Sequence, residues 1–270
     1  MDVTPVVSLA RHPAKASVGE RFEVSALVFR EGHDQLGAEV VLTDPAGVRR
    51  PPLRMSDVNG QVSRMAATVS PDAEGPWTFE VQAWSDPLGT WLHDAGIKIR
   101  AGVDVELMFT EGRLLFERVL AGGGSHAASQ LTPPEVAVLR GAIEAAQDTT
   151  RPVQARLAQL ESPELSDVLL AHPLRELVTV DGPYPAYADR QRALFSSWYE
   201  FFPRSEGAFR NPKTGAVVSG TFATAAKRLD AVAAMGFDVI YLPPIHPIGH
   251  EFRKGPNNST TAGPADPGSP

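Results

Sequence analysis

The sequence predicts a multidomain chain: an all-β, immunoglobulin-like sandwich, then a small α-helical bundle inserted after it, then one strand–helix–strand unit. Apolar and polar residues alternate over residues 1–103, and apolar residues recur at helical spacing over residues 104–175. From residue 194 onward, an amphipathic helical pattern is followed by a short, continuous apolar run. We therefore place a return segment or linker at residues 176–193 and a further domain at residues 194–270.

Composition narrows the class of protein. The 270 residues carry a net charge of -7 and contain no cysteine. The negative charge provides no basic surface, so we expect neither nucleic acid nor an acidic membrane as a partner. The absence of cysteine excludes disulfide scaffolds and thiol catalysis. The start of the chain lacks the pattern of a secretory signal, and no apolar stretch approaches the roughly 20 residues that span a bilayer. We expect a cytoplasmic protein.

The sandwich is predicted from alternation with a period of two. In "RFEVSALVFR" Val24 and Ala26 fall on one face, and in "PWTFEVQAWSD" Trp77 and Phe79 do the same. Turn residues separate such segments about every 8–12 residues, and about seven strands in 100 residues are typical of an immunoglobulin-like fold. We interpret "DAGIKIRAG" (94–102) as the last strand of this series.

The helical bundle is predicted from a change of period near Val105. Helical spacing begins in "VELMFTEGRLLFERVL", and the "GGGSHAAS" stretch after it is typical of a flexible connection. Thr132 and Glu135 then form a capping box around a helix predicted over residues 132–147. Two shorter helices are expected in "RPVQARLAQL" and "SPELSDVLLAHP". We interpret part of "LRELVTVDGPYPAYADRQRA" as a strand that returns to the sandwich.

The last region predicts a strand–helix–strand unit. "FSSWYEFFPRS" is a strand candidate rich in aromatic residues, and the helix predicted over residues 221–235 starts at Thr221 as its N-cap. Gly236 stands where a left-handed C-terminal cap belongs. "FDVIYLPP" is apolar without alternation, which is typical of a strand buried on both faces. Two such strands joined by a helix form a right-handed crossover unit.

Three motifs in this region resemble a known family. "WYEFFPRS", "HPIG" and "RKGPNN" are together similar to the opening of the catalytic barrel in bacterial α-1,4-glucan:maltose-1-phosphate maltosyltransferases. "GFDVIYLPPI" alone indicates only the wider α-amylase superfamily. The family also carries an N-terminal β-sandwich with a helical insertion, so the resemblance extends over the whole chain. It implies that residues 194–270 are the start of an incomplete (β/α)8 catalytic barrel.

The resemblance also implies a reaction. Members of the family move maltosyl units from α-maltose 1-phosphate to the non-reducing end of an α-1,4-glucan and release phosphate. They retain the anomeric configuration by double displacement, with an Asp nucleophile and a Glu general acid/base. The resemblance implies no cofactor and no metal. It further implies a homodimer to which the sandwich and the helical insertion contribute.

The catalytic carboxylates are expected outside this sequence. A (β/α)8 barrel needs about 250 residues, whereas residues 194 to 270 number 77 (270 − 194 + 1). A retaining site needs two carboxylates from different strands, and the family places them on later strands, beyond Pro270. We therefore assign no catalytic residue and expect this chain alone to be inactive. We interpret the acids of this region as structural or surface residues: Glu200, Glu206, Asp230, Asp238, Glu251 and Asp266.

Three residues are candidates for substrate binding. The ammonium group of Lys254, in the loop after the second strand, can donate hydrogen bonds to sugar hydroxyls, and the resemblance points to a contact with the donor sugar. Asn257 and Asn258 carry amides suited to hydroxyls, although Asn in "GPNN" is also an ordinary turn former. We expect His246 to support the loop rather than to transfer protons.

Two alternatives remain open on the sequence. The chain could belong to another α-amylase-superfamily enzyme, such as a branching or debranching enzyme, or it could act as a non-catalytic module for dimerisation or glucan binding. Independently of these alternatives, Trp84 and Trp91 could form a glucan-stacking surface. The alternation around Trp77 predicts a core residue instead.

Overall fold

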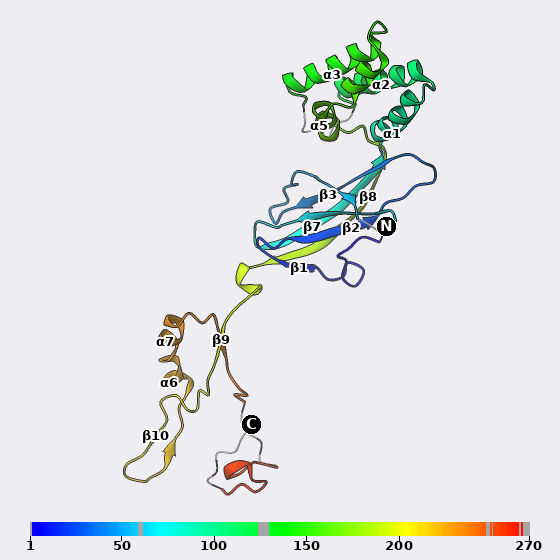
Figure 1. The fold of residues 1–270 in the computed structure, drawn as a ribbon. Helices are drawn as coiled ribbons and strands as arrows, with labels where there is room; N and C mark the ends of the chain where they lie inside the picture. The colour runs from blue at the N-terminus through cyan, green and yellow to red at the C-terminus, as the bar shows by residue number, and fades with distance from the viewer. Residues whose placement is uncertain are drawn as a thin grey trace. The chain divides into compact units, whose positions relative to one another are not determined.

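The computed structural model divides the chain into two compact units, Met1–Gln191 and Arg192–Pro270 (Figure 1). The first unit contains two β-sheets and a group of helices. The second contains a parallel strand pair, a hairpin and two short helices. The structure describes residues 2–58, 62–123, 130–246, 249, 251–264 and 266.

The β-region of the first unit consists of two sheets. A five-stranded sheet has the order β1-β8-β7-β3-β4, in which β1 and β8 are parallel and the other neighbours are antiparallel. A three-stranded antiparallel sheet has the order β2-β6-β5. The strands are β1 (Ala14–Ser17), β2 (Phe22–Leu27), β3 (Leu36–Thr43), β4 (Leu53–Arg54), β5 (Ser56–Asp57), β6 (Arg64–Val69), β7 (Gly75–Ser85) and β8 (Glu176–Asp189).

One apolar cluster joins the two sheets. Val24 on β2 and Val69 on β6 belong to the same buried cluster as Val40 on β3, Phe79 on β7 and Ala188 on β8. Each strand contributes alternate residues, because successive side chains of a strand point to opposite faces. The predicted alternation in the first 85 residues is therefore confirmed as a sheet-rich unit with a shared core.

The helices are inserted between two adjacent strands. The chain leaves the sheet after β7, forms five helices and returns as β8, which runs antiparallel to β7. The predicted return strand is thus confirmed. The helices are α1 (Pro87–Arg100), α2 (Val105–Leu120), α3 (Pro133–Gln147), α4 (Val153–Leu160) and α5 (Pro163–Ala171). Most of the stretch that we predict as flexible, residues 124–129, lies outside the described residues.

The prediction of a strand over residues 94–102 is wrong. These residues lie in α1 and the turn after it, so the helical region begins at Pro87, well before residue 104. The carboxylate of Asp86 accepts a hydrogen bond from the backbone N–H of Gly89 at 2.9 Å, and Pro87 occupies the first turn. Both features favour the start of a helix. Trp91 and Ile99 are buried in the core of the helical region. Ile97 and Ile99 alternate as in a strand, and this local pattern led to the wrong prediction.

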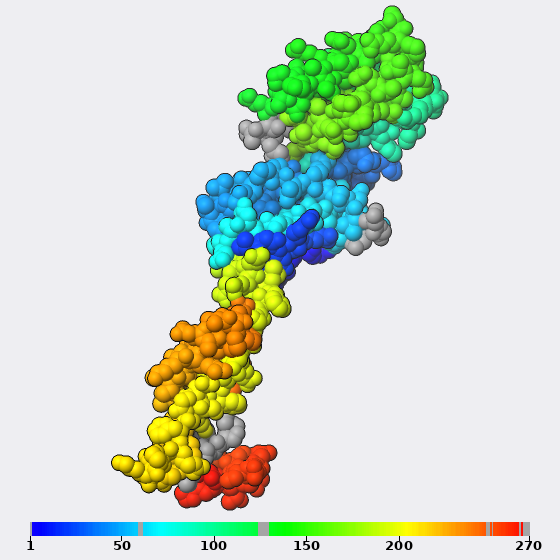
Figure 2. All heavy atoms as spheres, turned by 60° about the vertical axis from the view of Figure 1, so that its left-hand side comes forward, coloured from blue at the N-terminus to red at the C-terminus, as the bar shows by residue number. Residues whose placement is uncertain are grey.

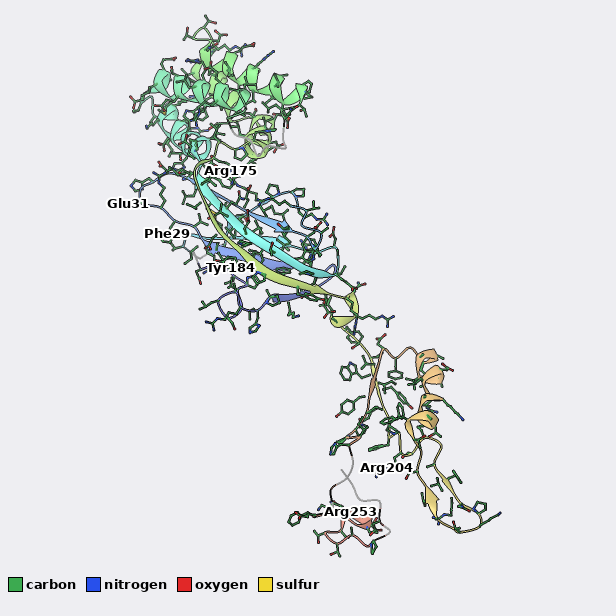
Figure 3. All side chains as sticks on the ribbon, turned by 180° about the vertical axis from the view of Figure 1, so that it is seen from behind. Phe29, Glu31, Arg175, Tyr184, Arg204 and Arg253 are labelled. Carbon is green, nitrogen blue, oxygen red and sulfur yellow. The ribbon has the colours of Figure 1, made fainter. Side chains whose placement is uncertain are left out.

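Arg175 lies where the helices give way to β8 (Figure 3). Its guanidinium donates to the amide oxygen of Gln82 at 2.6 Å and pairs with Glu39 at 3.0 Å. It also lies 4.3 Å from the ring centroid of Trp84. Burial lowers the pKa of Arg175. This side chain ties the entry of β8 to β3 and β7, and it fixes the returning strand against the strand from which the helices depart.

The second unit contains a strand–helix–strand sequence. β9 (Trp198–Glu200) and β12 (Val239–Tyr241) pair in parallel, and α6 (Phe222–Ala226) and α7 (Leu229–Ala234) lie between them in the chain. A hairpin of β10 (Phe209–Arg210) and β11 (Val217–Val218) precedes the helices and protrudes from this unit (yellow in Figure 2). The described residues also include two short 3-10 helices, η1 (Gln191–Ala193) and η2 (Pro256–Asn258).

The helix that we predict over residues 221–235 forms as two helices. The N–H groups of Lys227 and Arg228 bond to carbonyls three residues earlier, which tightens the backbone into a turn between α6 and α7. The predicted ends are confirmed: the Thr221 hydroxyl accepts from the N–H of Thr224, and Gly236 adopts a φ of 87°. A positive φ favours glycine because it has no Cβ.

Candidate functional site

Two loops meet at one edge of the parallel pair. Because β9 and β12 run in the same direction, their carboxyl ends lie at the same edge. The turn that contains residues 202–205 leaves β9 there, and the segment that contains residues 243–245 leaves β12. Ligands of parallel α/β proteins bind outside the carboxyl ends of the strands. This edge is therefore the first place to look for a site.

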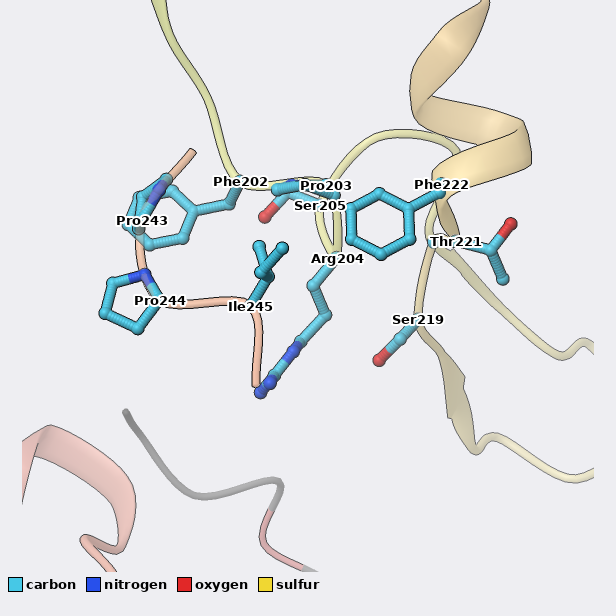
Figure 4. A pocket seen from close by; sticks show the side chains of 11 residues that line it. Phe202, Pro203, Arg204, Ser205, Ser219, Thr221, Phe222, Pro243, Pro244 and Ile245 are labelled. Carbon is cyan, nitrogen blue, oxygen red and sulfur yellow. The ribbon is translucent and has the colours of Figure 1, made fainter. Parts of the chain in front are cut away.

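A pocket of about 480 Å3 lies at this edge (Figure 4). Its volume falls within the range of small-molecule sites, about 300–1,000 Å3. The lining comes from the two loops and from the segment that leads into α6. The lining residues are Phe202, Pro203, Arg204, Ser205, Ser219, Gly220, Thr221, Phe222, Pro243, Pro244 and Ile245.

The pocket combines aromatic rings, hydroxyls and one cation. Phe202 and Phe222 are 56% and 59% exposed. Arg204 is the single charged residue among the lining residues and makes no ion pair within the described part of the chain. Figure 4 shows its side chain extended between Ile245 and Ser219. Such a lining suits a neutral polar molecule with apolar faces.

Hydrogen bonds hold the walls of the pocket in place. The N–H of Gly220 donates to the carbonyl of Arg204 at 2.8 Å, and the hydroxyl of Thr224 donates to the carbonyl of Glu206 at 2.7 Å. A Cβ at Gly220 would lie 2.1 Å from the Glu206 carbonyl oxygen, so this close approach requires glycine. The turn after β9 is thus fastened to the start of α6.

The predicted binding residues lie together in another loop. Lys254 is half-buried, whereas Asn257 and Asn258 are exposed and belong to η2. The N–H of Gly255 donates to the carbonyl of Ser259 at 2.9 Å and closes this loop. Both asparagines adopt positive φ, 55° and 60°, which agrees with their second role as turn formers. None of the three lines the pocket described above.

Two neighbouring side chains in this segment form hydrogen bonds with its backbone. Arg253, labelled in Figure 3, donates to the carbonyl of Asp266 at 2.5 Å. The carboxylate of Asp266 accepts from the N–H of Gly263 at 2.6 Å, so this acid has a structural contact. His246 is exposed after β12. Within the described ranges, no group of three His, Asp or Glu residues could hold a metal ion.

Asp238 also has a structural contact. It precedes β12, at the opposite end of the strand from the pocket, and it forms an ion pair with Arg192. Its carboxylate also accepts from the N–H of Ser197 at 3.2 Å. The bond to Ser197 joins the residues that directly precede β9 and β12.

The hypothesis of a glucan-stacking surface on Trp84 and Trp91 is wrong. The two side chains are 2% and 5% exposed. Trp91 donates its indole N–H to the carbonyl of Met108 at 2.8 Å, inside the helical core. Trp84 has the guanidinium groups of Arg54 and Arg175 at 4.6 Å and 4.3 Å from its ring. Trp77 is buried in the sheet core, as predicted.

The sequence patterns marked Thr221 only as a helix cap and assigned no binding role to the residues that line the pocket. Arg204 and Phe202 lie in the motif "WYEFFPRS", and Phe222 lies in the first turn of the predicted helix. Their position in a motif could have marked Phe202 and Arg204 as candidates for a site. The sequence could not show that the parallel pairing of β9 and β12 brings this motif to the same edge as the segment after β12. Separately, no helix in the described part of the chain is long and apolar enough to cross a membrane.

Comparison with known proteins gives consistent matches. A family profile described as "Alpha-1,4-glucan:maltose-1-phosphate maltosyltransferase, domain N/S" matches residues 1–190. A maltosyltransferase of that name from Streptomyces coelicolor is 50% identical over 269 residues, covering 100% of this chain and 38% of the relative. Those from Arcanobacterium haemolyticum and Mycobacterium tuberculosis are 45% and 41% identical, with 38% and 40% of the relatives covered.

The matched regions agree with the structure. The profile ends at residue 190, next to the boundary between the two units at Gln191. The similarity to the relatives extends beyond the first unit into the second, because these matches cover 100% of the chain. The chain spans about 38% of the length of these curated relatives. The chain belongs to the α-1,4-glucan:maltose-1-phosphate maltosyltransferase family.

Proposed function

We propose that this chain is the N-terminal portion of a glycosyltransferase that moves maltosyl units from α-maltose 1-phosphate to the non-reducing end of an α-1,4-glucan, with release of phosphate. The observation that carries the proposal is the 50% identity to a named maltosyltransferase over the entire chain. The profile match over residues 1–190 supports it independently of the barrel motifs. Both observations favour this enzyme over a branching or debranching enzyme.

The proposed architecture has three parts. The two sheets form an immunoglobulin-like sandwich, with the five helices as an insertion between β7 and β8. β9, the two short helices and β12 form the first unit of a (β/α)8 barrel. The parallel pairing of β9 and β12 supports this assignment, because neighbouring strands of such a barrel are parallel.

The proposed mechanism is a double displacement. An Asp carboxylate attacks the anomeric carbon of the donor, the bond to the phosphate oxygen breaks, and phosphate leaves. The terminal 4-hydroxyl of the glucan then displaces the Asp, while a Glu takes up the proton of that hydroxyl. We place both carboxylates in the remainder of the protein, since this chain spans 38% of the length of its relatives. No residue of this chain is assigned a catalytic role.

The residues of this chain would bind and orient the donor. Lys254, Asn257 and Asn258 share one closed loop in the segment after β12, where donors of hydrogen bonds to sugar hydroxyls are useful. We further propose a homodimer to which the first unit contributes. The cytoplasm is its proposed location, because a charged sugar phosphate does not cross a membrane unaided.

The test is an assay of phosphate release by the complete protein that carries these residues. We expect release from α-maltose 1-phosphate in the presence of maltohexaose, together with products that are two glucosyl units longer. We expect no release by residues 1–270 alone. An inactive complete protein, or products that grow by branching, would contradict the proposal.

A further inference from the structure

We propose that the pocket at the carboxyl ends of β9 and β12 binds a glucosyl unit of the acceptor glucan. This inference rests on the proposed function, because that function supplies the identity of the polymer. It adds a binding site, with Phe202, Arg204 and Phe222 as its contact residues, that is separate from the loop of Lys254. The pocket lining and the local hydrogen bonds carry the inference.

The lining fits the chemistry of a pyranose ring. Each glucosyl unit presents two faces of C–H groups and a rim of hydroxyls. Phe202 and Phe222 offer exposed aromatic faces on which the C–H groups can pack, and Pro243, Pro244 and Ile245 extend the apolar wall. The Arg204 guanidinium has five N–H donors for hydroxyl oxygens. Ser205 and Ser219 can both donate and accept. The volume of about 480 Å3 admits a sugar ring.

Hydrogen bonds within the protein hold the walls of the pocket. The Gly220 N–H bond to the Arg204 carbonyl and the Thr224 bond to the Glu206 carbonyl fix the turn that carries Arg204 and Ser205. The capping contacts between Thr221 and Thr224 fix the first turn of α6, which carries Phe222. Rigid walls reduce the loss of conformational entropy on binding, so a weakly interacting neutral sugar can still be held.

The same lining is poorly suited to the phosphate of the donor. Phosphate sites gather several cations or free backbone N–H groups. Among the described residues that line the pocket, Arg204 is the single charged one, and the Thr221 hydroxyl already accepts from the N–H of Thr224 at the start of α6. Six of the other ten described lining residues are aromatic or aliphatic. We therefore assign the pocket to a neutral glucosyl unit of the acceptor.

The test compares two pocket variants with a matched control in the complete protein. Phe222→Ala removes an aromatic wall and Arg204→Gln removes the guanidinium. Phe209→Ala removes an equally exposed phenylalanine, 55%, that lies on β10 outside the pocket. Calorimetric titration with maltohexaose, without donor, measures binding. Phosphate release at varied maltohexaose and at varied α-maltose 1-phosphate measures the two KM values. Circular dichroism melting checks that each variant folds.

We expect both pocket variants to raise the dissociation constant and the KM for maltohexaose about 10-fold, as for loss of a charged hydrogen-bond donor or an aromatic contact. The KM for α-maltose 1-phosphate should stay unchanged, and Phe209→Ala should behave like wild type. An acceptor KM within about two-fold of wild type in both variants, or a change in the donor KM instead, would overturn the inference. If the wild type releases no phosphate, the proposed function fails, and the titration alone then decides whether the pocket binds the oligosaccharide.

Discussion

At the scale of single residues, one buried arginine joins three helices of the helical region. Arg156 on α4 is almost fully buried, and its guanidinium forms two bonds to the Glu106 carboxylate, at 2.6 Å and 3.0 Å. It also donates to the carbonyl of Ala146 at 2.6 Å and lies 3.7 Å from the ring centroid of Phe109. Buried carbonyl groups at the end of a helix need hydrogen-bond donors, and Arg156 supplies one to the last turn of α3. The same side chain joins α3 and α4 to α2 through Glu106.

Glu135 is expected to make the helical region sensitive to acid. The N–H and hydroxyl of Thr132 donate to its carboxylate at 2.7 Å and 2.8 Å, and these bonds lower the pKa of Glu135, with a smaller contribution from His172. A lowered folded-state pKa means that the stabilisation is present above the pKa of the unfolded chain. It is lost as the pH falls through the folded-state value.

The corresponding prediction concerns Glu135→Gln. The neutral amide cannot lose a charge, so we expect the variant to lose less unfolding free energy than wild type between pH 7 and about pH 3. At pH 7 the variant should be less stable by about 0.5–1 kcal/mol, since the carboxylate is largely in contact with solvent. Urea unfolding at several pH values measures both effects. Parallel pH profiles for the two proteins would contradict the role assigned to this carboxylate.

Lys254 is expected to matter for the donor and not for folding. Loss of one charge-assisted hydrogen bond costs about 1.5–3 kcal/mol, so Lys254→Ala in the complete protein should lower kcat/KM for α-maltose 1-phosphate about 10- to 150-fold. The melting temperature should not change, because the side chain lies on a loop. Lys213→Ala, on the exposed loop of the β10–β11 hairpin, is the matched control. An unchanged kcat/KM would make Lys254 an ordinary solvated lysine.

At the scale of elements, sequence patterns predicted those helices and strands whose local signals agree with their packing. The capping box of α3 and the glycine after α7 gave two accurate boundaries. The alternation around Val24 and Phe79 predicted their strands because half of each strand is buried in one core. α1 was missed because Ile97 and Ile99 resemble a strand, although the helical spacing of Leu88, Trp91, Ala95 and Ile99 was present.

The close contact between Gly112 on α2 and Trp91 on α1 is expected to tolerate no larger side chain at position 112. A Cβ at Gly112 on α2 would lie 2.1 Å from the Trp91 ring, whereas a Cβ at Gly141 on α3 would meet nothing within 4 Å. Gly112→Ala should therefore destabilise the protein by about 1–3 kcal/mol through overpacking, despite the better helix propensity of alanine. Gly141→Ala should stabilise it by about 0.5–1 kcal/mol. Urea unfolding of both variants measures the difference, and equal signs would contradict this account of the close approach.

At the scale of the whole molecule, the sequence patterns indicated separate regions but not which distant segments pair with one another. The return of β8 beside β7 joins residues about 100 positions apart, as in the pairing of Trp77 with Ala186. Local periodicity contains no information on such pairing. The pocket shows the same limit, because Arg204 and Ile245 meet only through the parallel pairing of β9 with β12. The motifs marked both segments without showing that they share one site.

The two units are expected to differ in resistance to protease. The first has two clusters of buried side chains, whereas Phe195, Trp198 and Tyr241 of the second are 83%, 59% and 48% exposed. Local opening is cheap where few apolar contacts hold the backbone. Brief thermolysin treatment of residues 1–270 should therefore degrade the segment from Arg192 onward and leave a stable product that ends near Gln191, as mass spectrometry would show. In the complete protein, which we propose to close the barrel, the same cleavage should be at least 10-fold slower, because the strand faces would then be covered. A second unit that survives as long as the first in residues 1–270 would contradict this difference in packing.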